Sequence, residues 1–398
     1  MWKNNLAMVG LSQFLSMLGF AFAMPFAPYY IQELGITDQS ELKKWVAVFT
    51  AATPLTLAIF APIWGAIGDR YGRRLMLLRA NLAGMIVVAL MGVVPNVQML
   101  VGLRLLQGAL TGTMAAAQIF VSVHSSQRRS GQALGMLSAA VYSGSMIGAF
   151  IGGIFAEWLG YRLAFIASSA FLALASLLVL LGTREQFVPP VGELVEPSLE
   201  ERVKLVWTKM GPALPILTVV GIIGFVLQFD FAWLPLLVQD IHGSLKGAAF
   251  LTGLLSAITG IAGFIAGPVI GRLADMVAPP RIAKISALMG GVMLILIAFA
   301  QNFGLLLGAR FGAAFCAAGL DPVFQIWLAK TTPAASRGMI FGWATTARAL
   351  GWMSAPLVSG TIAWMFGLRA VFFSASAIFF LLIPVITLIV GRLRQTKE

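Results

Sequence analysis

The sequence predicts an all-α membrane protein with twelve transmembrane helices in two similar six-helix bundles. The first observation is composition: 59% of the 398 residues are hydrophobic and 11% are charged, whereas about 25% of residues are charged in soluble domains. The second is a series of apolar runs near the roughly 20 residues that a helix needs to cross a bilayer. The third is a set of motifs that recur at nearly constant spacing. A soluble core of this length cannot hold so much apolar surface, so we expect a polytopic membrane protein.

The predicted spans are separated by short polar connections, except for one longer polar segment after the sixth. The sequence Ala21-Phe22-Ala23 resembles a signal-peptide cleavage site. The first apolar run is, however, about twice as long as a signal peptide allows, so we interpret it as a spanning helix. In chain order the spans are 6–30, 45–67, 75–94, 98–121, 132–156, 163–182, 212–238, 248–271, 282–300, 303–326, 339–364 and 369–390.

The basic residues predict the orientation of these spans, because Lys and Arg concentrate in cytoplasmic loops. With a cytoplasmic N-terminus, 19 of the 27 basic residues fall in inner segments, 5 in outer segments and 3 inside predicted helices. We therefore expect a multi-pass protein of the cell (inner) membrane with both termini in the cytoplasm. Nucleic acid is not an expected partner, because the basic residues lie in short connectors and not on one solvated face.

Four motifs occur twice in the same order. "GAIGD" at 65–69 recurs 206 residues later as "GRLAD", and "NVQMLVGLR" at 96–104 recurs at the same offset as "NFGLLLGAR". "GQALG" at 131–135 and "GYRLAF" at 160–165 recur at an offset of 207 as "GMIFG" and "GLRAVF". The sequence therefore predicts a duplication.

The duplication defines the expected domains. Residues 1–182 form an N-terminal six-helix bundle, 183–211 a polar cytoplasmic linker and 212–398 a C-terminal six-helix bundle. Repeated membrane halves are typical of secondary transporters.

The segment "GAIGDRYGRR" at 65–74 gathers charge and glycine between two apolar runs. Gly65 and Gly68 would allow close approach of helix backbones, and Gly72 would allow a tight turn. An acid such as Asp69 is favoured near the N-terminus of another helix. The alternative is a positively charged loop with a purely structural turn. The arginines that we expect to meet anionic lipid are Arg70, Arg73 and Arg74.

This loop resembles the signature loop of the major facilitator superfamily. A degenerate copy with Gly271 and Asp275 falls where that family has its second copy. "LRLLQG" at 103–108 is similar to the fourth-helix motif of proton-coupled members. "GSMIGAFIGG" at 144–153 resembles the fifth-helix motif of drug/proton antiporters, with Ala149 where that family usually has proline. The resemblance covers essentially the whole chain and is greatest to the MdtG-type multidrug exporters.

The resemblance implies the major facilitator fold and alternating access by rocking of the two bundles. It implies that Asp69 contacts the eleventh helix when the cytoplasmic side is closed, and so acts as a latch. It also implies that the first, fourth, seventh and tenth helices line a cavity. We expect a monomer in lipid with a small-molecule substrate and protons as partners, no cofactor, and a proton gradient as the driving force.

Five ionisable residues fall inside predicted helices, where charges are rare and usually face a cavity or a partner. By depth along the helices, Asp230 can meet either Arg104 or Arg310, and Asp321 can meet Arg348. A carboxylate that alternates between an arginine and a watery cavity titrates differently in the two states. Our hypothesis makes Asp230 the proton carrier and Asp321 a structural partner; the alternative is that these groups form ion pairs that hold the halves together.

A stripe of small residues marks the fifth predicted helix and recurs in the eleventh. It suits tight helix packing, which alone would explain it; the functional alternative is a smooth face for rocking. We also expect Pro25, Pro28 and Pro235 to bend the first and seventh helices. The stripe in the fifth helix consists of Gly144, Gly148, Gly152 and Gly153.

Several classes of function are disfavoured by what the sequence lacks. No G-x-x-x-x-G-K-[ST] phosphate loop occurs, so the chain does not hydrolyse nucleotide by that route. One cysteine and two histidines make a metal site improbable, and no catalytic constellation indicates an enzyme. We predict proton-coupled efflux of small amphiphilic compounds. The alternatives are transport of a specific metabolite such as a sugar or organic anion, and a membrane protein without transport activity.

Overall fold

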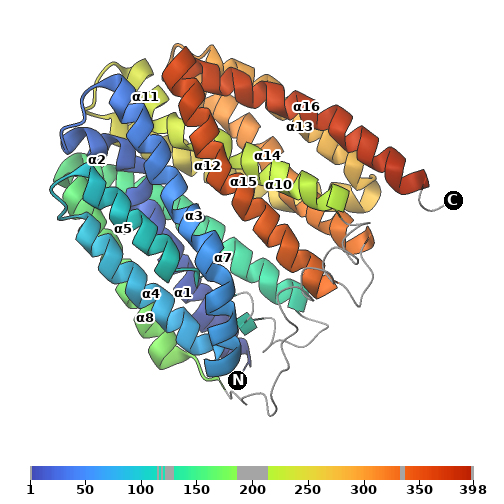
Figure 1. Cartoon of the computed structure of the whole chain (residues 1–398), viewed down its shortest axis with the longest axis horizontal. Helices are drawn as coiled ribbons and strands as arrows, with labels where there is room; N and C mark the ends of the chain where they lie inside the picture. The colour runs from blue at the N-terminus through green and yellow to red at the C-terminus, as the bar shows by residue number, and fades with distance from the viewer. Residues whose placement is uncertain are drawn as a thin grey trace.

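The computed structural model describes residues 2–113, 116–117, 120–121, 130–185, 214–331 and 337–395, and the regular secondary structure in these residues is helical. Figure 1 shows the first half of the chain, in blue to green, beside the second half, in yellow to red. Ten described helices are long and apolar enough to cross a membrane, and two shorter apolar helices cover 97–110 and 303–318. Each of the twelve predicted spans overlaps one of these helices, and the predicted fold class is confirmed.

The first half begins with a span that is divided into three helical pieces. Its elements are α1 (Trp2–Ala23), the 3₁₀ helix η1 (Met24–Phe26), α2 (Ala27–Glu33), α3 (Gln39–Tyr71), α4 (Arg73–Met91), α5 (Val97–Leu110), α7 (Ser130–Leu159) and α8 (Tyr161–Gly182).

The second half begins with a span divided in the same way. Its elements are α10 (Leu214–Phe229), the 3₁₀ helix η2 (Phe231–Trp233), α11 (Leu234–His242), α12 (Ala248–Met276), α13 (Pro279–Ala298), α14 (Phe303–Thr331), α15 (Arg337–Phe366) and α16 (Leu368–Gln395).

Prolines occupy the two interrupted spans, as the sequence predicted. Pro25 lies within η1, and Pro28 and Pro235 lie in the first turns of α2 and α11. Proline is tolerated in the first turn because its missing N–H would have no partner inside the helix there. The two interruptions lie 207 residues apart, so the duplication extends to the backbone.

One predicted span continues less far as a helix than expected. The fourth span was predicted over 98–121, but α5 ends at Leu110, and Thr111 and Gly112 are not helical. Gly112 has φ +121°, a conformation that a residue with a side chain rarely adopts. The Thr111 hydroxyl donates to the Gln107 carbonyl at 2.7 Å, so a side chain partly satisfies the backbone at the interruption.

Each half is a bundle, and two helix pairs join the halves. In the first half α1 packs against α7 and α8; in the second, α10 packs against α15, and α13 against α14 and α16. Between the halves, α7 packs against α12 and α3 against α15. Most of the predicted linker, 183–211, lies outside the described residues, so the domain boundaries stay a prediction.

We name the two ends of the molecule by their connections. The terminal end is the one where α1 begins and α16 ends. The distal end carries the connections at 34–38, 92–96, 160, 243–247, 299–302 and 367.

Candidate functional site

A buried ion pair joins the interrupted seventh span to the tenth. Asp230 lies between α10 and η2, and its Oδ2 is 2.6 Å from Nη1 of Arg310 on α14. Both side chains are less than a tenth exposed, at 7% for Asp230 and 9% for Arg310. Nε of Arg310 also donates to the Thr259 hydroxyl at 3.2 Å. Since a buried charge without a partner is strongly disfavoured, each member of this pair depends on the other.

Arg104, the other arginine that Asp230 could have met, has different surroundings. Its Nη1 donates to Oε1 of Gln107 at 2.6 Å and lies 3.3 Å from the sulfur of Met24. Its Nε lies 3.4 Å from the Phe49 carbonyl, and its guanidinium lies 4.5 Å from the centre of the Phe49 ring. No carboxylate forms a salt bridge with Arg104 within the described part of the chain. The structure thus pairs Asp230 with Arg310.

The second predicted pair falls partly outside what the structure describes. The backbone of Asp321 belongs to α14, but its side chain is outside the described residues. Arg348 lies on α15 and packs against Gly224 of α10. The pairing of Asp321 with Arg348 therefore stays a prediction.

The glycine- and arginine-rich segment forms a sharp turn between α3 and α4. Gly72 has φ +96° and caps both helices without a side chain of its own. The carboxylate of Glu185, just past α8, accepts hydrogen bonds from the backbone N–H groups of Arg73 at 3.0 Å and Arg74 at 2.7 Å. A carboxylate in this position satisfies unpaired amides and complements the helix dipole. Glu185 was not predicted as a functional residue, although the sequence carries a signal for it: an acid directly after a span, with no capping side chain at Gly72.

The arginines of this turn differ in direction. Nη2 of Arg74 donates to the Leu180 carbonyl at 2.6 Å, and Nη1 of Arg73 lies 3.4 Å from the Gly65 carbonyl. Both side chains thus contact protein carbonyls, whereas the sequence predicted contact with lipid. Arg70 is exposed, with its guanidinium 6.0 Å from the centre of the Tyr71 ring, and its contact with lipid stays a prediction.

A Cβ at Gly65 would meet no atom of the described residues within 4 Å, so the expected close approach there stays a prediction. The Gly68 Cβ position, in contrast, is crowded by the side chains of Arg73 and Met76. The predicted latch lies outside the described residues, as do the side chains of Asp69 and Asp275 and the surroundings of Gly271.

The glycine stripe on α7 serves two contacts. A Cβ at Gly144, Gly148 or Gly152 would collide with the backbone of α1, so these three glycines allow the two helices of one half to touch. Gly153 instead faces the other half: its Cβ would lie 2.8 Å from the Ala249 carbonyl oxygen on α12. Most of the stripe therefore serves packing within the first half, and one member lies between the halves.

The C-terminal half repeats both contacts. Gly351 of α15 meets the backbone of α10 at Gly221, as Gly144 meets α1. A Cβ at Gly360 would lie 2.5 Å from the Ala47 Cβ on α3, across the two halves.

Polar contacts between the halves gather at the distal end. The Tyr29 hydroxyl donates to the Pro235 carbonyl at 2.5 Å and lies 2.7 Å from the Thr252 hydroxyl. The side-chain amides of Gln32 and Gln239 exchange two hydrogen bonds of 2.8 and 3.0 Å. This closure was not predicted, although the 207-residue separation of the two glutamines places them at equivalent positions of the repeat.

Two further bonds cross the distal end. Nε1 of Trp364 donates to the Ser40 hydroxyl at 2.7 Å, and the backbone N–H of Gly247 donates to the Glu157 carboxylate at 2.7 Å. The distal end is therefore closed by hydrogen bonds from several connections.

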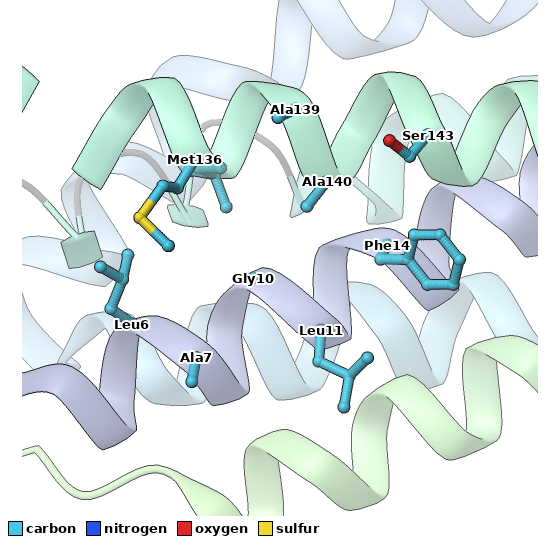
Figure 2. A pocket seen from close by; sticks show the side chains of 10 residues that line it. Leu6, Ala7, Gly10, Leu11, Phe14, Met136, Ala139, Ala140 and Ser143 are labelled. Atoms are coloured by element: carbon cyan, nitrogen blue, oxygen red, sulfur yellow. The ribbon is translucent and has the colours of Figure 1, made fainter. Parts of the chain in front are cut away.

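A separate cavity of about 370 Å³ lies between α1 and α7, towards the terminal end. Figure 2 shows Leu6 and Phe14 of α1 facing Met136 and Ala140 of α7 across it. No charged side chain of the described residues lines this cavity, and the described lining offers apolar contact. Its lining consists of Leu6, Ala7, Gly10, Leu11, Phe14, Met136, Leu137, Ala139, Ala140 and Ser143.

The structure consists of two repeated membrane bundles. One bundle holds a buried ion pair, and hydrogen bonds between the bundles close the distal end. These features define a membrane transporter and not an enzyme. The sequence model of the Major Facilitator Superfamily matches residues 9–288 and 244–398. The chain belongs to this superfamily, and the resemblance seen in the sequence is confirmed.

Two similar sequences carry the same name. The chain is 34% identical to the multidrug resistance protein MdtG of Proteus mirabilis (strain HI4320), with 96% of this chain and 95% of that protein covered. It is 32% identical to the protein of the same name from Klebsiella pneumoniae (strain 342), with 93% and 90% covered.

Solved transporters share the fold at low identity. A bacterial homolog of the human lysosomal transporter Spinster, in an inward-facing and occupied conformation, has a TM-score of 0.73 at 15% identity, with 97% of this chain and 96% of that chain covered. The human organic anion transporter MFSD10 (TETRAN) has a TM-score of 0.67 at 17% identity, with 97% and 99% covered.

Proposed function

We propose that this protein exports small amphiphilic compounds in exchange for protons, by rocking its two bundles between two access states. The family and the multidrug resistance relatives support export of such compounds. The observation that carries the proton coupling is the buried pair of Asp230 and Arg310 in the interrupted seventh span. Transport of a specific metabolite is not favoured by these relatives.

Asp230 is the proton carrier in this proposal. When it is ionised, it holds Arg310; when it is protonated, the arginine loses its charge partner and the pair is weakened. Because a buried unpaired charge is unfavourable, protonation changes which arrangement of the helices is stable. The segment η2, which directly follows Asp230, packs against α3 of the other half. A change at the pair can therefore reach the contact between the bundles.

The orientation is also part of the proposal. The positive-inside distribution supports cytoplasmic termini, which makes the distal end the outer side. The hydrogen bonds at Tyr29 and Gln32 then close the outer side, and export requires that they break. Asp69 acts at the opposite end, as a latch on the state in which the cytoplasmic side is closed. The transporter works as a monomer in lipid, and the proton gradient drives it without a cofactor.

Transport in everted vesicles tests the proton role. With an imposed pH gradient and a panel of fluorescent amphiphiles, Asp230→Asn should abolish pH-driven transport but retain substrate binding. The matched control is Asp240→Asn, which removes an exposed acid of α11 whose carboxylate lies 3.8 Å from Arg369. This control should transport normally.

A double variant separates coupling from stability. If Asp230→Asn fails only because Arg310 is left unpaired, then Asp230→Asn with Arg310→Gln should restore transport. The proposal expects better thermal stability in the double variant but no pH-driven transport. Full pH-driven transport in Asp230→Asn would refute the assignment and move the proton role to Asp321 or the coupling to another ion.

A further inference from the structure

The internal duplication makes a direct comparison of two arginines possible. Arg104 on α5 and Arg310 on α14 occupy equivalent positions, 206 residues apart. In the interrupted spans the offset is 207 residues, so Asp230 corresponds to Ala23, the residue directly before Met24. In the second half, Nη1 of Arg310 contacts the Asp230 carboxylate at 2.6 Å; in the first half, Nη1 of Arg104 contacts the Met24 sulfur at 3.3 Å. The arginine of the first half therefore contacts a thioether, whereas the arginine of the second half contacts an acid.

Arg104 consequently carries its charge at membrane depth beside neutral groups. Its described partners are the Gln107 amide, the Met24 sulfur, and the carbonyl and ring of Phe49. Its Nη2 has no hydrogen-bond partner among the described residues, and the side chain is only partly buried. A cation in such a place is unfavourable until an anion joins it.

The position of Arg104 makes it reachable when the bundles rock. Its neighbour Met24 belongs to η1, which packs against α12 of the other half. Phe49 belongs to α3, the helix that packs against α15 of the other half. The guanidinium therefore lies beside the boundary between the bundles, next to a ring and a thioether that suit an apolar ligand.

We propose that Arg104 binds the anionic group of the transported amphiphile, with Phe49 and Met24 contacting the adjoining apolar part. The substrate supplies in the first half the negative charge that Asp230 supplies in the second. A carboxylate suits the guanidinium best, because the two groups form parallel charge-assisted hydrogen bonds. This inference rests on the proposed function and adds to it a substrate class and a residue that selects it.

Binding to the purified full-length protein tests the inference without any gradient. The probes are dansylglycine, which carries a carboxylate, and its uncharged amide dansylglycinamide, followed by fluorescence titration. Wild type should bind the carboxylate about tenfold more tightly, a difference of about 1.4 kcal/mol. Arg104→Gln should remove this preference and leave binding of the amide unchanged.

Substitution of Met24 provides an independent test that keeps the arginine. Met24→Asp places an acid beside Arg104, where the Met24 sulfur lies 3.3 Å from Nη1 in wild type. It should therefore occupy Arg104 and weaken binding of dansylglycine about tenfold. Met24→Asn is the neutral control of similar size and should keep the preference for the carboxylate. The thermal unfolding of each variant shows whether it is folded.

Equal affinity of wild type for the two probes would overturn the inference. An equal loss of affinity for both probes in Met24→Asp would also overturn it. So would an unchanged preference for the carboxylate in a folded Arg104→Gln protein. Binding that selects the carboxylate but transport that ignores the pH gradient would keep this inference and remove the proton coupling. Transport driven by the pH gradient, without selection of the carboxylate by Arg104, would overturn this inference and keep the proton coupling.

Discussion

At the scale of single residues, the structure gives similar side chains different tasks according to their neighbours. Arg310 has a buried carboxylate at 2.6 Å, whereas its counterpart Arg104 contacts an amide, a thioether and a ring. The Glu185 carboxylate accepts hydrogen bonds from the backbone N–H groups at the start of α4. Depth in the membrane explains why such groups are few, and the contacts of each one explain what it can do.

Removing the Glu185 carboxylate should destabilise the turn between α3 and α4. Glu185→Ala leaves the first amides of α4 without their acceptor, and loss of a helix cap costs about 0.5–2 kcal/mol. Glu41→Ala is the matched control, because Glu41 forms an exposed pair with Lys44 at 3.0 Å, and exposed pairs contribute at most about 1 kcal/mol. Thermal unfolding in detergent should show the larger decrease for Glu185→Ala. Equal decreases would contradict the capping role.

At the scale of elements, small residues decide which helices touch. In a bilayer the lipid is as apolar as the helix faces, so close packing supplies much of the attraction between helices. Gly148 of α7 packs on the backbone of α1 at Leu18, whereas Gly153 meets α12 of the other half. A single stripe thus builds one bundle and also contributes to the contact between bundles.

Gly148→Ala should therefore destabilise the first bundle. The new Cβ would collide with the Leu18 backbone, and overpacking typically costs about 1–3 kcal/mol. Gly10→Ala, in α1, is the control because its Cβ would meet no atom within 4 Å. In a helix that change stabilises by roughly 0.5–1 kcal/mol. Opposite shifts in the unfolding temperature are expected, and a Gly148→Ala protein as stable as wild type would refute the packing assignment.

At the scale of the whole molecule, the distal end is closed by contacts that must break in each transport cycle. Tyr29 and Gln32 of the first half bind partners on the second half. Such hydrogen bonds are modest individually, about 0.5–1.5 kcal/mol each, so a few of them can hold one state without making it permanent. The fold therefore suits a transporter with two states of similar free energy.

Cross-linking the distal end should stop transport. In a Cys316→Ser background, Gln32→Cys with Gln239→Cys joins two positions whose amides are 2.8 Å apart in wild type, within reach of a short thiol reagent. The cross-linked protein should lose transport and regain it after the link is cleaved. Each single cysteine variant, treated alike, should remain active. Undiminished transport in the linked protein would show that the distal end does not open.

Orientation in the membrane is tested by reporter fusions. Fusions after Lys3, Thr208 and Thr396 should report the cytoplasm, because the basic residues gather in those segments. Fusions near Ser40 and Ser244 should report the outside. An external Thr208 would break the twelve-helix topology.

The sequence by itself determined the helices and their duplication. A span is recognised from local composition, because each backbone polar group in lipid must be satisfied within its own helix. The offset of 206–207 residues placed Arg104 with Arg310 before any contact was known. It also placed prolines at the two interruptions, although it did not reveal the break at Thr111 and Gly112.

Only the tertiary structure decided which groups meet. Depth along the helices allowed Asp230 to pair with either arginine, and helix packing selected Arg310. Glu185 capping α4 and Gln32 facing Gln239 depend on segments more than 100 residues apart. Composition specifies how deep a residue lies, but the rotation and tilt of each helix specify its neighbours. Those are set by side-chain packing across the whole bundle, which a single stretch of sequence does not contain.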